Sequence, residues 1–126
     1  MVQTDISQLS AETAEWRQIL RNYREEFTDC KKLLSENCKH THTKDQLQEV
    51  EHFDNQFHIQ LINIHDVKKE IKQHEKTVDF ELSQNEYVSG ETFANHEWLL
   101  DSFLRLENRL QQLRSEFRDF INATNC

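Results

Sequence analysis

Three groups of histidines stand out, because imidazole, carboxylate and thiolate groups at regular spacing can bind metals or move protons. The first group lies in EVEHFDNQFHIQ, residues 49–60. Glu49 and His52 have the Glu-x-x-His spacing of di-iron and di-manganese bundles, which place two such motifs inward on facing helices. Here there is one motif, and its histidine points away from the predicted apolar face. Asp54 and His58 then form an ordinary i,i+4 pair on a solvated helix side.

The second group is the pair His74 and His96, which falls on the apolar faces of two predicted helices. A single histidine at such a position usually makes a hydrogen bond that fixes how helices pair. Two neighbouring histidines could instead bind a metal, with Glu70 close by, or repel on protonation and make this end sensitive to pH. The sequence leaves these interpretations open.

The third group is the loop CKHTH, with Cys38, His40 and His42, and Cys126 ends the chain on the same side of the predicted bundle. Two thiolates and two imidazoles can form a tetrahedral zinc site. The spacing is tighter than in zinc modules, so a polar loop is the alternative interpretation. We expect reduced thiols, because the chain has an odd number of cysteines and no evident disulfide framework.

Composition narrows the function classes. Fifteen Lys and Arg against twenty-three Asp and Glu give a formal charge of −8, and the basic residues alternate with acids instead of forming a stripe. Such a surface repels nucleic acid. A single glycine excludes a glycine-rich phosphate loop, and Cys30 lies on a core position, so we expect neither an enzyme nor a cofactor. Residues 1–16 lack the blocks of a signal peptide, and no apolar run approaches a membrane span, so we expect a cytoplasmic protein without membrane contact.

Three periodic segments must position these groups: helices over about residues 10–37, 43–82 and 92–122, each with apolar residues at alternating steps of three and four. Ser10 is the expected N-cap of the first helix, although Ile6 and Leu9 could add a turn before it, and Thr43 with Gln46 forms an expected capping box at the second. The apolar face of the second helix repeats every seven residues, as in a heptad seam, at Val50, Phe57, Ile64, Ile71 and Val78.

The pattern predicts an all-α fold, an elongated antiparallel up-down-up three-helix bundle with coiled-coil-like heptad seams, as a single domain over residues 1–126. Folding the chain at its two breaks sets Tyr23 near Phe57 and Phe57 near Phe117. The first helix then stops short of the far end, which is two-helical unless Ile6 and Leu9 cover it. Open apolar surface there predicts an interface. The predicted interface residues are His74, Val78, Leu82, Phe93, His96 and Leu100.

The stretch EHFDNQF, together with an early Trp and a later His-Glu pair, resembles a group of short bacterial all-helical proteins. The resemblance covers about the first two helices, implies a small helical protein, and brings no activity with it. It also implies that polar residues of this stretch, His52, Asn55 and Gln56, could meet a partner helix. The matching residues are Trp16, Glu51, His52, Phe53, Asn55, Gln56, Phe57, His74 and Glu75.

The sequence thus favours a non-enzymatic protein that acts through protein–protein interaction, with a homodimer as the preferred form. The competing hypothesis is a metal-binding helical bundle with His and Glu ligands, or Cys and His ligands.

Overall fold

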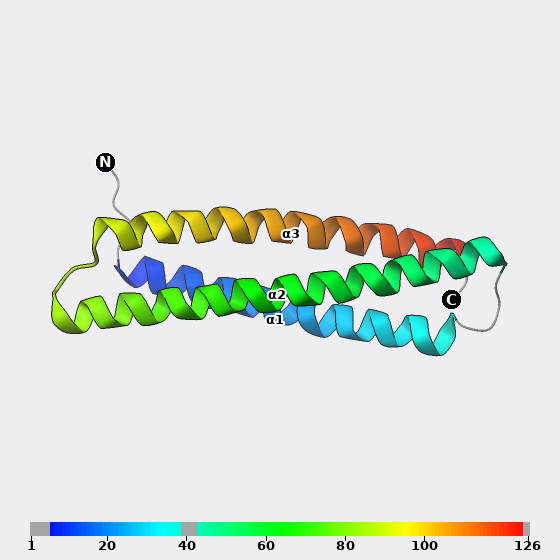
Figure 1. Ribbon diagram of the computed structural model, residues 1–126, viewed down its shortest axis with the longest axis horizontal. Helices are drawn as coiled ribbons and strands as arrows, with labels where there is room; N and C mark the ends of the chain where they lie inside the picture. Colours follow the sequence, from blue (N-terminus) through cyan, green and yellow to red (C-terminus); the bar gives the residue numbers. More distant parts are fainter. Residues whose placement is uncertain (1–5, 39–42, 125–126) are drawn as a thin grey trace.

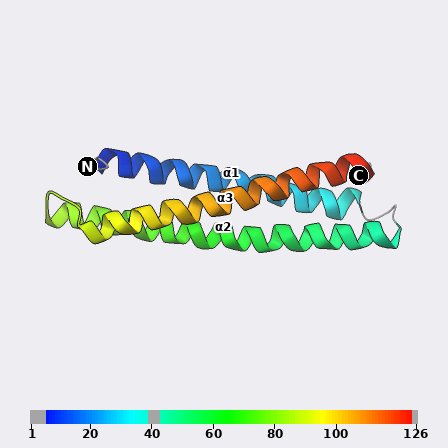
Figure 2. The same ribbon diagram turned by 90° about the horizontal axis from the view of Figure 1, so that it is seen from above.

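The structure, a computed structural model, describes residues 6–38 and 43–124. In it the chain folds into three long helices. They are α1 (Ile6–Asn37), α2 (Lys44–Gln84) and α3 (Gly90–Thr124). The helices lie side by side as a rod, with the chain running up, down and up (Figures 1 and 2). The predicted all-α three-helix bundle is confirmed. Among the described helices, none combines the length and the apolar character that a bilayer span requires.

The buried faces are those that the periodicity predicted. In α2, Phe57, Ile64, Ile71 and Val78 are buried, and Val50 at the start of the series is half-buried. Each such side chain contributes about 1.5–3 kcal/mol by leaving water. The core continues through α3, whose predicted apolar residues are all buried: Leu99, Phe103, Leu106, Leu110, Leu113, Phe117 and Phe120.

One predicted helix start is confirmed and the other is wrong. The Thr43 hydroxyl accepts a hydrogen bond from the Gln46 N–H, and the Gln46 side chain accepts one from the Thr43 N–H, both at 3.2 Å, so the capping box at α2 exists. In contrast, α1 begins at Ile6, and Ser10 lies inside the helix. The helix extends further because Leu9, which is 1% exposed, gains a buried site against the other helices.

The packing order of the aromatic rings corrects the predicted register of α1. Phe57 packs on Phe117 with ring centroids 4.9 Å apart, as expected, but its partner in α1 is Phe27, at 5.0 Å, instead of Tyr23. Helix α1 is therefore shifted by about one turn toward the α2–α3 connection. This shift brings Leu9 and Thr13 over the end that the sequence estimate left open.

Only the tip of the predicted two-helix end is two-helical. Figures 1 and 2 both show α2, α3 and their connection projecting beyond the start of α1. The connection is held by Glu81, whose carboxylate accepts hydrogen bonds from the Ser89 N–H, at 2.7 Å, and from the Thr92 hydroxyl. The bond from Thr92, followed by that from Ser89, lowers the pKa of Glu81. The anionic carboxylate thus joins the end of α2 to the first turn of α3.

Two isoleucines of α2 provide a matched test of the core. Ile64 is fully buried, whereas Ile62 is 48% exposed. We expect Ile64→Ala to lower the free energy of unfolding by about 2–5 kcal/mol, because it leaves a cavity among packed rings, and Ile62→Ala to change it by less than about 0.5 kcal/mol. Urea unfolding followed by circular dichroism measures both. Equal losses of unfolding free energy in the two variants would contradict the assignment of Ile64 to the buried side of α2 and of Ile62 to its exposed side.

Candidate functional site

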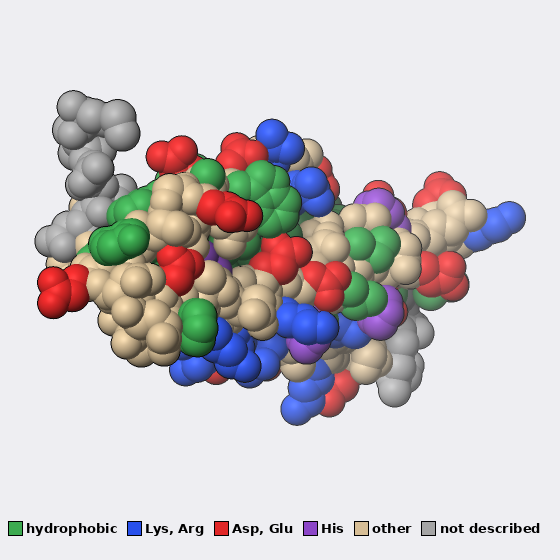
Figure 3. Space-filling view, turned by 60° about the vertical axis from the view of Figure 1, so that its left-hand side comes forward, with side chains coloured by type: hydrophobic (Ala, Val, Ile, Leu, Met, Phe, Trp, Pro, Cys, Tyr) green, Lys and Arg blue, Asp and Glu red, His purple; other side chains and the backbone are tan. Residues whose placement is uncertain are grey.

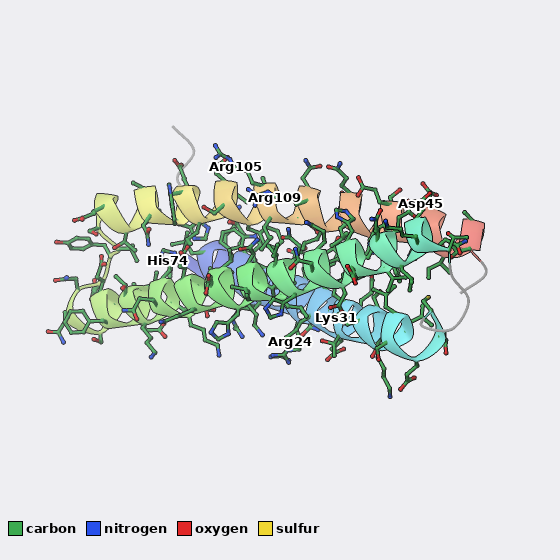
Figure 4. The ribbon with its side chains drawn as sticks, turned by 45° about the vertical axis from the view of Figure 1, so that its right-hand side comes forward. Arg24, Lys31, Asp45, His74, Arg105 and Arg109 are labelled. Carbon is green, nitrogen blue, oxygen red and sulfur yellow. The ribbon has the colours of Figure 1, made fainter. Side chains whose placement is uncertain are left out.

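The structure brings His74 of α2 and His96 of α3 into direct contact inside the bundle. Their side chains are 2% and 3% exposed, and Nε2 of His74 lies 3.0 Å from Nδ1 of His96. Figure 4 shows His74 on the inner side of α2, facing α3. The sequence predicted both histidines on apolar helix faces and near one another; the observed register brings them within hydrogen-bonding distance.

Two further residues extend this contact into a chain, here called the imidazole relay: Asn95, His74, His96 and Glu12. Nδ2 of Asn95 lies 3.3 Å from Nδ1 of His74, and Nε2 of His96 lies 2.7 Å from Oε2 of Glu12. Asn95 is exposed and the Glu12 side chain is 29% exposed. The relay therefore runs from one surface of the protein to another through its interior, with every ring nitrogen of the two histidines engaged.

One proton arrangement satisfies the whole relay when both rings are neutral. The amide of Asn95 donates to His74 Nδ1, the Nε2–H of His74 donates to His96 Nδ1, and the Nε2–H of His96 donates to the ionised Glu12. One added proton fits on Nδ1 of His74 if Asn95 presents its amide oxygen, and the bonds from His74 to His96 and from His96 to Glu12 keep their directions. A second added proton would set the N–H groups of His74 and His96 against each other at 3.0 Å. The two histidines together therefore accept at most one added proton.

Burial decides the charge state of the relay. Loss of hydration lowers the pKa of His74, and a charge on His96 lowers it further, while the carboxylates of Glu75 and Glu81 act in the opposite direction. The ring of Trp16 stacks on His96 with centroids 4.9 Å apart. The interior therefore favours the neutral form of His74 near pH 7.

A second polar cluster borders the relay and ties α1 to α2. The Thr13 hydroxyl donates to Glu75 at 3.0 Å, and Nε of Arg17 lies 2.9 Å from the other oxygen of Glu75, as an ion pair whose N–H is not aligned for a hydrogen bond. A hollow of about 240 Å³ opens between these helices beside His74. Both nitrogens of His74 are occupied by Asn95 and His96, so the arrangement can store or pass a proton but presents no free base to this hollow.

The predicted metal set is only partly brought together. His74 and His96 meet, but Glu70 is exposed and borders a different surface hollow, with Lys69 and Gln73. The imidazole lone pairs that a metal would need are used within the relay. Among the described residues, no group of three or more His, Cys, Asp or Glu side chains is placed to hold a metal ion.

The cysteine and histidine loop lies mostly outside the described residues, which exclude His40, His42 and Cys126. Cys38 is buried and disulfide-bonded, so the expectation of reduced thiols is wrong for this residue. A disulfide sulfur is not a thiolate ligand. Cys30 is a free thiol, and burial, followed by the charges of Glu26 and Asp29, raises its pKa to about 11.

The charged and imidazole side chains of residues 49–60 lie on the solvated side of α2, as predicted. Glu49, His52, Asn55 and His58 are exposed, and Asp54 pairs with Lys31 of α1 at 3.2 Å instead of with His58. His52 and the half-buried Gln56 border a shallow groove between α2 and α3.

The predicted interface residues divide into two groups. His74, Val78 and His96 are buried within the chain, because α1 reaches them. Leu82, Phe93 and Leu100 are half-buried. Sequence reasoning missed Glu12 and Asn95 as partners of the two histidines; a register one turn further along would have brought Glu12 closer to the level of His96.

A scan against protein-family models, a search of curated proteins and a search of solved structures each gave no match to this chain.

We expect the relay to make stability depend on pH near neutrality. The pKa of His74 lies below its ordinary 6.5 in the folded chain, so as pH falls through 6.5 the unfolded chain binds a proton that the folded chain does not. The free energy of unfolding should therefore fall, by at most about 1.4 kcal/mol per pH unit for this one group. Urea titrations from pH 8 to 5.5 should show a shallower slope in His74→Gln. The exposed His65→Gln should keep the original slope; an unchanged slope in His74→Gln would exclude this role.

The two described cysteines should differ in reactivity. At pH 8, Cys30 should react slowly with iodoacetamide in the folded chain, because its pKa of about 11 leaves little thiolate, and quickly in urea. Cys38 should stay unmodified in urea until a reductant is added. Peptide mapping by mass spectrometry reads both residues, and alkylation of Cys38 without reductant would contradict the disulfide.

Proposed function

We propose that this chain is a non-enzymatic helical-bundle protein that acts by binding protein, in the first place a second copy of itself. One observation carries the proposal. The exposed aromatic residues of the described chain lie in or near the α2–α3 connection: Phe80 in the last turns of α2, Tyr87 in the connection itself and Trp98 in the third turn of α3. They are 65%, 66% and 57% exposed, respectively. We call this group the aromatic tip.

Exposed aromatic rings at one place favour an interface over ordinary surface. Trp and Tyr are the residues that most often dominate binding energy, because they bury a large area at low cost in side-chain entropy. The other large exposed apolar residues are aliphatic and lie on the lengths of α2 and α3: Leu47, Ile59, Ile62 and Leu104. Single exposed aliphatic residues are common on monomers.

The location of the tip also favours docking. α1 begins at Ile6, so the end of α2 and the α2–α3 connection project beyond its described residues (Figure 1), whereas Trp98 lies farther along α3, close to the level at which His96 contacts α1. Leu82 and Phe93, which the sequence predicted as interface residues, are half-buried there. A partner that covers the tip would complete their burial and supply the third layer that the rest of the bundle has.

The neighbourhood of Trp98 favours a second copy as the occupant. One and two turns further along α3 lie Asp101 and Arg105, which form an ion pair at 3.0 Å. This strip of α3 therefore carries an apolar ring, an anion and a cation in order. Two such strips placed antiparallel about a twofold axis bring Trp98 of each copy to Arg105 of the other, a cation–π arrangement, so the surface is complementary to itself.

The expectation that the chain is not an enzyme is supported by the state of its two buried histidines, whose ring nitrogens are all engaged in the relay. Cytoplasmic location stays a prediction. The disulfide at Cys38 weighs against it, because structural disulfides are rare in reducing compartments.

We expect a concentration-dependent dimer. Light scattering coupled to size exclusion should give twice the chain mass of 15.2 kDa at high concentration. Trp98→Lys should give the monomer mass with unchanged helicity by circular dichroism, because in the proposed dimer it sets an ammonium group against Arg105 of the other copy. Leu104→Lys is the matched control, since Leu104 is 51% exposed on another side of α3, and its mass should follow the unsubstituted chain.

A monomer at every concentration, or a dimer that persists in Trp98→Lys, would reject the aromatic tip as a self-association surface. Equal loss of the dimer in Leu104→Lys would place the contact elsewhere on α3.

A further inference from the structure

Cationic side chains crowd one groove between α1 and α2, although the chain as a whole carries −8. The groove measures about 420 Å³ and is bordered by Arg24 of α1 and by His65, Lys68, Lys69, Lys72 and Lys76 of α2. Figure 3 shows Lys and Arg side chains gathered along the lower edge of one face, with most Asp and Glu above them. We propose that this basic groove binds a compact polyphosphorylated ligand through its guanidinium and ammonium groups.

Within the described chain, none of the cations that border the groove forms an ion pair with a carboxylate. The ion pairs of the described chain involve Arg17, Lys31, His96, Arg105 and Arg114, none of which borders the groove. Burial of its ammonium group, followed by the charges of Arg24 and Arg21, lowers the pKa of Lys68. The cations therefore repel one another, and an anion bound among them would relieve that repulsion.

The sequence conceals this groove because each helix intersperses its basic residues with acids. In RQILRNYREE the last arginine is followed by two glutamates, and in DVKKEIKQHEK two of the four lysines have a glutamate beside them. Helical periodicity sorts these residues onto different sides. The packing of α1 on α2 then places Arg24 of α1 beside the lysines of α2. The sequence of either helix alone does not predict this basic groove.

The extent of the groove favours a short polyanion. Lys68 and Lys76 are eight residues apart on one helix, which is about 12 Å at 1.5 Å per residue, with Arg24 approaching from the other helix. Two or three linked phosphates can contact this whole row, whereas a single phosphate contacts part of it. Guanidinium and ammonium groups are the usual protein donors to phosphate oxygens.

Long or flat polyanions fit less well. Nucleic acid or an anionic membrane would reach past the groove onto a surface that is net acidic, and repulsion there would oppose binding. Figure 4 places Arg24 on the opposite side of the molecule from Arg105 and Arg109, so these cations cannot extend the groove into a continuous track.

The test is calorimetric titration of the full chain with sodium tripolyphosphate at low salt, with inorganic phosphate as the comparison. Tripolyphosphate should bind one per chain, more tightly than phosphate, and more weakly as salt rises. Lys68→Gln/Lys72→Gln should reduce its affinity by about tenfold or more, because two charge-assisted contacts are lost. Arg109→Gln/Arg118→Gln removes the same charge from exposed positions of α3 and should keep the affinity within about twofold.

A second measurement reports location. Amide chemical shift changes on addition of tripolyphosphate should concentrate in residues 17–24 and 65–76. Absence of binding, or equal weakening in the two double variants, would overturn the proposal. Tighter binding of phosphatidylserine vesicles or single-stranded RNA than of tripolyphosphate, at equal phosphate concentration, would overturn the choice of a compact ligand. Because Lys68 and Lys72 lie outside the aromatic tip, loss of dimerisation and loss of anion binding are separable results.

Discussion

The register of the three helices depends on the hydrogen-bond chain from Glu12 through His96 and His74 to Asn95. A seam of Leu, Ile and Phe is tolerant of slippage, because moving one helix by a turn again sets apolar residues against apolar residues. The relay is not tolerant, because its buried ring nitrogens are satisfied only when all four residues are level. Slippage by a turn would bury imidazole groups without partners, at about 1–3 kcal/mol for each unsatisfied group. A few polar atoms thus select one arrangement among several that the apolar seam would allow.

A second contact fixes the opposite half of the bundle. Arg114 of α3 donates to both oxygens of Glu26 in α1, at 2.7 and 2.8 Å, and its guanidinium lies over the ring of Tyr23. This contact is partly exposed, so its net contribution is modest, about 1 kcal/mol or less. Its geometry is demanding, however, because a fork of two hydrogen bonds and a stacked ring admit one relative position of the helices. α1 and α3, which touch less than the other pairs, are therefore aligned at two levels by polar side chains.

The fold followed from the sequence because its determinants are local and repetitive. Helix number, the buried faces and the capping box at Thr43 all derive from patterns within one segment. The register of α1 did not follow, because equal steps of apolar residues fit several offsets, and the residues that decide between them, Glu12 and Asn95, look like ordinary surface polar groups. The estimate placed Tyr23 where Phe27 packs, and this error of one turn left His74 and His96 apparently uncovered. The sequence therefore identified the two histidines of the candidate site. Their hydrogen-bond partners, Glu12 and Asn95, became evident only from the structure.

The same register determines how charge is distributed over the surface. Within each helix, cations and anions alternate, and the total is strongly negative. Once α1 and α2 are aligned, Arg17 forms an ion pair with Glu75. Arg24, two turns further along α1, lies near Lys68 instead, and the two like charges repel. A relative shift would replace these neighbours by others and redistribute the charge. The relay, the ion pair of Arg17 and the unneutralised groove lie along adjoining turns of the same two helices, so the contacts that select the register also fix the basic groove as a defined surface of the folded chain.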